Sequence, residues 1–174
     1  MGGGVVTDPA SPFNPTPPRM DSPAAVADAL RWGFDAAIAR GARHISCVSA
    51  LFVAWPLDEP PLLDALTQWL RLPQRQLLLL AADYGAMGTQ YPRFTEWRRN
   101  FVHAAPAWCC PPELVHSLPE ALFDDDNISV QLFDAESGRG RASLEHRHRL
   151  LLAQQADVVL QRSAASWPVR TLGL

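Results

Sequence analysis

The sequence contains no lysine, because all 15 of its basic residues are arginine. This absence excludes Schiff-base catalysis and every site built on a P-loop or protein-kinase lysine. The chain also lacks an excess of positive charge, since its formal net charge is -3. Nothing in the overall charge therefore draws it toward nucleic acid or an anionic membrane, and we predict neither as a partner.

Long apolar runs and a disulfide framework are missing as well. No apolar stretch approaches the roughly 18 residues that cross a bilayer, and no basic segment precedes an apolar one as in a secretory leader. The three cysteines include the adjacent pair Cys109 and Cys110, which indicates reduced thiols rather than disulfides. We therefore expect a cytoplasmic protein.

The composition changes near residue 21. Residues 1–21 hold five prolines and three glycines, a composition typical of a tail or an extended arm. Met20 is an alternative start of the chain. Residues 22–174, with a high apolar content, are expected to form a single domain with its own core.

Helices and strands alternate along this domain. Capping residues and apolar spacing predict four helices, which are a first at 22–41, a second that begins at Asp58 and closes at Pro73, a third at 92–104 and a fourth at 144–155. Apolar and β-branched runs predict strands at 43–49, 75–83, 108–110, 127–134, 141–143 and 157–161. The acidic residues 124–126 are predicted to lie in a loop.

This alternation predicts an α/β fold: a mixed, mostly parallel sheet with helices on both faces and a late β-hairpin. The strand at 75–83 is expected at the centre, because residues 77–82 are all apolar and suit burial on both faces. Asp83 and Tyr84 follow this strand directly. The carboxyl edge of parallel strands is where ligands bind in such sheets, so both residues are candidates for a binding site.

The order of elements resembles one half of a phospholipase D-like domain. Members of that superfamily carry H-x-K-x4-D on the first strand of the hairpin, and the matching frame here is Asn127-x-Ser129-x4-Asp134. Only the aspartate of the motif is kept. The resemblance implies a degenerate active site, because neither Asn127 nor Ser129 can attack phosphorus as an imidazole does. It also implies a homodimer, since the superfamily builds its site from two halves.

From these observations we expect a non-catalytic binding or regulatory module, without cofactor or metal, that pairs with itself. A small anionic ligand is a further expectation. The candidate ligand-binding residues are Asp83, Tyr84, Asn127, Ser129, Asp134 and Arg141.

Two alternatives stay open. The first is an enzyme acting on a small phosphate or carboxylate compound, with Asp83 or Asp134 as base and an arginine such as Arg93 or Arg141 as clamp. It requires these groups to converge on one pocket. The second is a purely structural homodimer partner, which would present a large apolar interface and no polar pocket.

Overall fold

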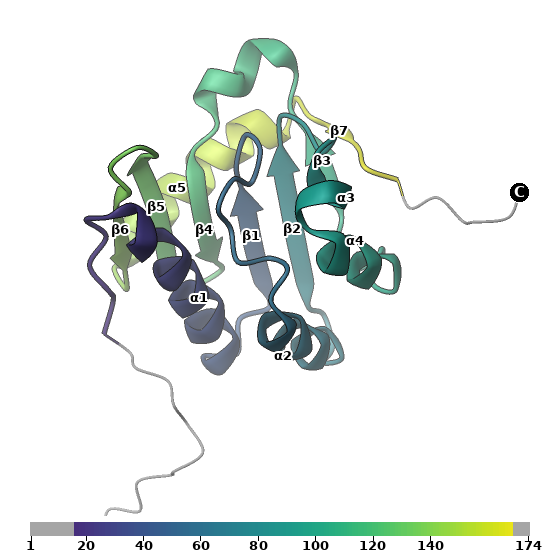
Figure 1. Cartoon of the computed structure of the whole chain (residues 1–174), viewed down its shortest axis with the longest axis horizontal. Coiled ribbons are helices and arrows are strands. Elements are labelled where there is room, and N and C mark those ends of the chain that lie inside the picture. The colour runs from purple at the N-terminus through teal and green to yellow at the C-terminus, as the bar shows by residue number, and fades with distance from the viewer. Residues whose placement is uncertain (1–15, 169–174) are drawn as a thin grey trace, which may run out of the picture.

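The computed structural model describes residues 16–168, which form one seven-strand mixed sheet and six helices (Figure 1). The strands are β1 (His44–Val48), β2 (Gln76–Ala81), β3 (Ala107–Cys109), β4 (Glu120–Asp124), β5 (Ser129–Asp134), β6 (Arg139–Ser143) and β7 (Ala164–Ala165). The helices are α1 (Pro23–Ala39), α2 (Pro60–Leu70), α3 (Met87–Gln90), α4 (Pro92–Arg99), the 3-10 helix η1 (Pro112–Ser117) and α5 (His146–Leu160). The α/β class predicted from the sequence is confirmed.

The sheet has the strand order β6-β5-β4-β1-β2-β3-β7. Only β1 with β2 and β2 with β3 pair in parallel, and the other four pairings are antiparallel. The prediction of a mostly parallel sheet is therefore wrong. The reason is that β4 enters beside β1 in the reverse direction, after which β5 and β6 follow as successive hairpins. The predicted late hairpin is confirmed as β5–β6.

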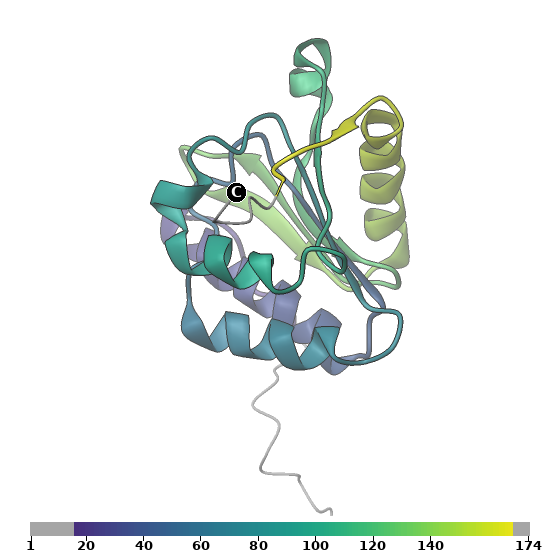
Figure 2. The ribbon, with the colours of Figure 1, turned by 90° about the vertical axis from the view of Figure 1, so that its right-hand side faces the viewer.

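Helices cover both faces of the sheet, as predicted, but they cover them unequally (Figure 2). Helices α1, α2, α3 and α4 lie on one face, and α5 lies alone on the other. Because side chains alternate along a strand, Leu79 packs into the core under the first group and Leu80 packs against α5. The core of the α5 side is the smaller one, and α5 lies over β4 and β5.

The first helix follows its sequence signals closely. Ser22 adopts an extended conformation and its Oγ accepts a hydrogen bond from Ala25 N at 3.3 Å. Gly41, with a φ of 75°, ends the helix in the left-handed region that glycine tolerates.

Asp58 does not cap the second helix, contrary to the prediction. Glu59 holds that position, without a side-chain capping bond. The Oδ1 of Asp58 instead accepts hydrogen bonds from Arg93 N at 2.7 Å and Phe94 N at 3.1 Å. It therefore caps α4, and the loop between β1 and α2 is fastened to a helix far along the chain.

Three other predicted boundaries change. The third helix ends at Arg99 rather than at residue 104, and the short helix α3 precedes it. The predicted strand at 157–161 belongs to α5, because no glycine or proline interrupts that helix before Leu160. The acidic residues 125 and 126 lie in a bend as predicted, but residue 124 ends a strand that was not predicted, β4, in which Leu122 and Phe123 are buried on opposite faces.

Residues 16–21, the described part of the predicted arm, pack against the domain. Met20 is buried, and its carbonyl oxygen accepts a hydrogen bond from Gly140 N at 3.2 Å. Asp21 forms an isolated antiparallel bridge with Arg139. This segment therefore covers one end of the outer strand β6, and residues 1–15 of the arm lie outside the described residues.

Candidate functional site

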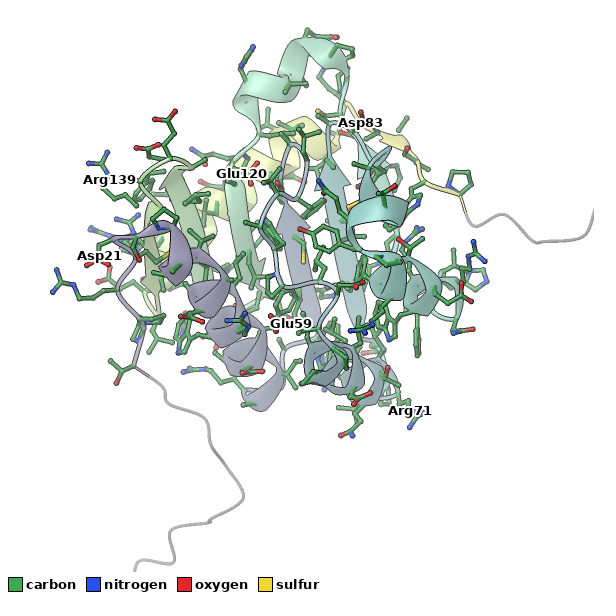
Figure 3. The ribbon with its side chains drawn as sticks, viewed as in Figure 1. Asp21, Glu59, Arg71, Asp83, Glu120 and Arg139 are labelled. Atoms are coloured by element: carbon green, nitrogen blue, oxygen red, sulfur yellow. The ribbon has the colours of Figure 1, made fainter. Side chains whose placement is uncertain are left out.

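The carboxyl edge of the parallel strands carries three acidic residues from different elements. Asp83 follows β2, Asp134 ends β5, and Glu120 begins β4, which runs antiparallel to β1 and so starts where β1 ends. Asp83 and Glu120 both lie along this edge in Figure 3. Each of the three carboxylates is already engaged in local hydrogen bonds.

Glu120 fastens the loop that follows β1. Its Oε2 accepts a hydrogen bond from Ser49 Oγ at 2.6 Å, and its Oε1 accepts one from Ala50 N at 2.8 Å. Ser49 Oγ in turn accepts a hydrogen bond from Phe52 N at 2.8 Å. Both carboxylate oxygens are used, so Glu120 acts here as a clip rather than as a free base.

Asp83 and Tyr84 lie next to each other but differ in environment. Asp83 is exposed, and its Oδ1 accepts a hydrogen bond from Gly85 N at 2.7 Å in a tight turn. Tyr84 is buried, and its hydroxyl donates to Trp108 O at 2.7 Å. Burial raises the pKa of the Tyr84 phenol, so this residue stays neutral and serves packing.

Asp134 and Arg141 belong to the β5–β6 hairpin. Asp134 accepts hydrogen bonds from Glu136 N at 3.1 Å and from Ser137 Oγ at 2.8 Å, and these bonds lower the pKa of its carboxyl group. Arg141 is exposed, and its guanidinium lies over the ring of Phe133 at 5.6 Å. Within residues 16–168, no ion pair is formed by Arg141.

Asn127 and Ser129 lie toward the opposite end of β5 from Asp134. Ser129 and Asp134 are five positions apart along the strand, which corresponds to about 17 Å. Asn127 Oδ1 faces the ring nitrogen of His146 at 3.2 Å, and Ser129 is buried opposite Ser143 of β6. Asp83 and Asp134 are themselves three strand spacings apart, about 14 Å. The six candidate residues therefore do not form one pocket.

Another surface, on the α5 face, was missed by the sequence analysis. Helix α5 packs against β4 and part of β5 and leaves most of the outer strand β6 uncovered. Gln131 of β5 and Arg141 of β6 are cross-strand partners on that uncovered face. Phe133 lies two residues after Gln131 on β5 and so points to the same face. We call this surface, together with the adjoining side of α5, the α5 groove.

The α5 groove has a volume of about 590 Å³ and is open to solvent. Its floor includes Gln131 and Phe133, α5 contributes Gln155 and Val158, and the segment after η1 closes one end with Leu118. The wall and floor therefore combine apolar side chains with amide groups. This mixture suits a protein or peptide surface better than a charged small molecule.

The apolar side chains around the groove are unusually exposed. Val158 is 65% exposed, Leu151 56% and Phe133 51%. Leu151 and Val158 are seven residues apart and so lie on one side of α5, while Leu152 and Val159 form the stripe that faces the sheet. The sequence signal for this surface is the second apolar stripe, Leu151 and Val158. A helix that packs against a sheet on one side needs only the stripe that faces the sheet, so a second stripe indicates another contact surface.

The described part of the chain holds no cluster of side chains that could bind a metal ion. Within residues 16–168, no group of three or more histidine, cysteine, aspartate or glutamate side chains could hold a metal ion. Cys109 Sγ donates to Ala82 O, and Cys110 is buried.

Within residues 16–168, no helix has both the length and the apolar character that a bilayer crossing requires.

Comparison of the chain with protein-family models, with curated proteins and with solved structures found no match.

Proposed function

We propose that this protein is a non-catalytic binding module that associates with a second copy of itself through the α5 groove. The observation that carries the proposal is the exposed apolar stripe of Leu151 and Val158 beside the bare β5–β6 face. Contiguous apolar groups rimmed by polar ones are typical of interaction surfaces. Association would remove them from water at a gain of roughly 25 cal/mol per Å² of apolar area.

The engagement of the carboxylates supports a non-catalytic role. A general base must reach the proton it takes, and its carboxylate must be available for that task. Asp83 and Asp134 each close a local turn, and Glu120 holds the Ser49 loop. Of the two arginines named as the clamp of the alternative enzyme, Arg141 lies over the ring of Phe133.

A second copy fits the groove for reasons of symmetry and composition. A two-fold interface places the same patch on both subunits, so the patch must complement itself. The α5 groove offers both a convex element, the Leu151–Val158 stripe, and a concave one, the floor with Phe133. The amide groups of Gln131 and Gln155 can donate and accept, and so they suit a self-complementary contact.

The resemblance to a phospholipase D-like half domain leads to the same proposal. Strand β5 carries the degenerate frame of Asn127, Ser129 and Asp134, and it also forms the floor of the groove. Because the superfamily builds its site from two halves, the resemblance implies that two copies pair across the face that carries this frame. The element order differs from the expected one by the additional strand β4 and by the helical segment 157–160, so the family relationship remains a proposal.

Sedimentation velocity on two charge variants tests this function. We expect the double variant L151E/V158E to be monomeric at concentrations where the wild-type chain is dimeric, because burying two carboxylates in an apolar contact is unfavourable. The matched control is Leu72→Glu, since Leu72 is 49% exposed and lies in the turn after α2. If the Leu72 variant dissociates to the same extent, or the double variant stays dimeric, the α5 groove is not the interface.

A further inference from the structure

Arg98 is a buried cation whose hydrogen-bond partners are neutral. It lies on α4 and is only 4% exposed. Its Nε donates to Ala105 O at 2.9 Å and its Nη1 donates to Trp167 O at 2.7 Å. Among the described residues, no carboxylate lies within ion-pair distance of its guanidinium.

An isolated buried charge is costly unless a countercharge accompanies it. Burial lowers the pKa of Arg98, because removal from water disfavours the charged guanidinium. Two carbonyl oxygens and the ring of Trp167, whose centroid lies 4.6 Å from Cζ, offset part of it. A guanidinium has five N–H donors, so capacity for an anion remains.

A cleft of about 290 Å³ opens beside this guanidinium. Its lining includes Arg98 itself, Val102 and Pro106 after α4, Trp108 of β3, and Trp167. Apart from Arg98, these side chains present flat or aliphatic surfaces. The volume is at the lower end of the range for small-molecule pockets.

The ring of Trp167 is held in place on two sides. It stacks on Tyr84 at a centroid distance of 5.3 Å, and Arg98 lies over it. Trp167 has a φ of 49°, which a bulky residue rarely adopts, so tertiary contacts determine its conformation. One wall of the cleft is therefore preformed.

We propose that this cleft binds a small organic monocarboxylate with a flat apolar body. The single guanidinium matches one negative charge, and its fork matches the two oxygens of a carboxylate. The ring of Trp167, together with Val102 and Pro106, would contact the apolar body. The site is separate from the α5 groove, because it lies at the β3–β7 edge on the other side of the parallel strands.

Titration calorimetry with benzoate, and with acetate and inorganic phosphate for comparison, tests the proposal on the full chain. We expect benzoate to bind more tightly than acetate, because acetate lacks the apolar body. We also expect benzoate to bind more tightly than phosphate, because phosphate gains nothing from the apolar walls. No heat of binding for benzoate, or a preference for phosphate, would overturn the proposal.

Two variants locate the site. Arg98→Met should lower the affinity for benzoate by about tenfold or more, since it removes the charge-assisted hydrogen bonds. Because this change can also loosen the contact with Trp167, Ala165→Trp provides a second test in which Arg98 is kept. Ala165 is exposed and lines the cleft, so a large ring there should fill it and abolish binding.

Ala39→Trp is the matched control, because Ala39 is exposed at the end of α1, away from the cleft. It should bind benzoate as the wild-type chain does. If Ala165→Trp also retains wild-type affinity, benzoate occupies another place and the assignment to Arg98 is wrong.

Discussion

Ser49 Oγ donates a 2.6 Å hydrogen bond to Glu120 Oε2 and so joins the end of β1 to the start of the antiparallel strand β4. The other oxygen of Glu120 accepts from Ala50 N, so one side chain holds the turn at the carboxyl edge. Catalytic groups are often found at this edge of a sheet. In this protein Glu120, one of three acids at this edge, fixes the loop that leads to α2.

Replacing this acid should weaken the fold. We expect Glu120→Ala to lower the free energy of unfolding by about 1–3 kcal/mol, because Ala50 N and Ser49 Oγ would lose their acceptors. Urea denaturation measures the difference. Glu136→Ala is the control, since Glu136 is an exposed acid of the β5–β6 turn, and its effect should stay within about 0.5 kcal/mol. Equal effects of both changes would show that the clip contributes nothing.

Gly138 lies where the hairpin meets the start of α1. Its φ is 71°, and a Cβ atom there would lie 2.1 Å from the carbonyl oxygen of Ser22. We expect Gly138→Ala to destabilise the protein by more than the roughly 1–2 kcal/mol that the left-handed conformation alone costs. The reason is that the backbone of the α1 cap must also move.

Gly41→Ala is the matched control for this strain. Gly41 has a similar φ of 75°, but nothing lies within 4 Å of an added Cβ atom. Thermal unfolding of both variants separates the two effects. If both lose the same stability, the close approach between Gly138 and Ser22 does not matter.

Asp124 is an acid buried at the end of β4. Its Oδ1 accepts hydrogen bonds from Asp126 N and Ile128 N, both at 2.9 Å, while Oδ2 is buried and has no hydrogen-bond partner among the described residues. Burial raises the pKa of Asp124 above its ordinary value of 3.8. At pH values between the pKa of the unfolded state and that of the folded state, the carboxyl group is protonated in the folded protein but ionised in the unfolded chain.

The stability contributed by Asp124 is therefore fully present below the ordinary pKa and is lost as pH rises through the folded pKa. Asp124→Asn keeps an oxygen acceptor and cannot ionise. We expect the stability of this variant relative to wild type to increase from about pH 4 to about pH 8. Asp125→Asn controls for removal of a charge from the same turn. A constant or opposite difference for Asp124→Asn would mean that its carboxyl group is not stabilised in the neutral form.

The sequence predicted the parts of the fold that depend on local signals. The apolar run at 77–82 became a central buried strand, and Ser22 and Gly41 mark the ends of α1 as expected. The strand at 157–161 was wrong because two adjacent valines suit a strand by propensity, but the preceding helix continues through them. Strand β4 was missed because its apolar segment, residues 121–123, is only three residues long and is followed directly by the acidic turn.

The arrangement of the candidate residues depended on the direction of β4, which no local pattern revealed. With β4 antiparallel to β1, Glu120 reaches the carboxyl edge, whereas Asn127 and Ser129 fall toward the opposite one. The capping of α4 by Asp58 and the burial of Arg98 against Trp167 also join residues that are far apart in the chain. Long-range contacts of this kind require the tertiary structure.

Sedimentation equilibrium is the most direct test of the proposed self-association, carried out on the full-length chain and on a chain that starts at Met20. We predict a dimer for both, because the α5 groove lies on described residues outside the arm. A dissociation constant of about 1 μM would correspond to about -8 kcal/mol of association free energy. A monomer in both chains over the whole accessible concentration range would contradict the proposal.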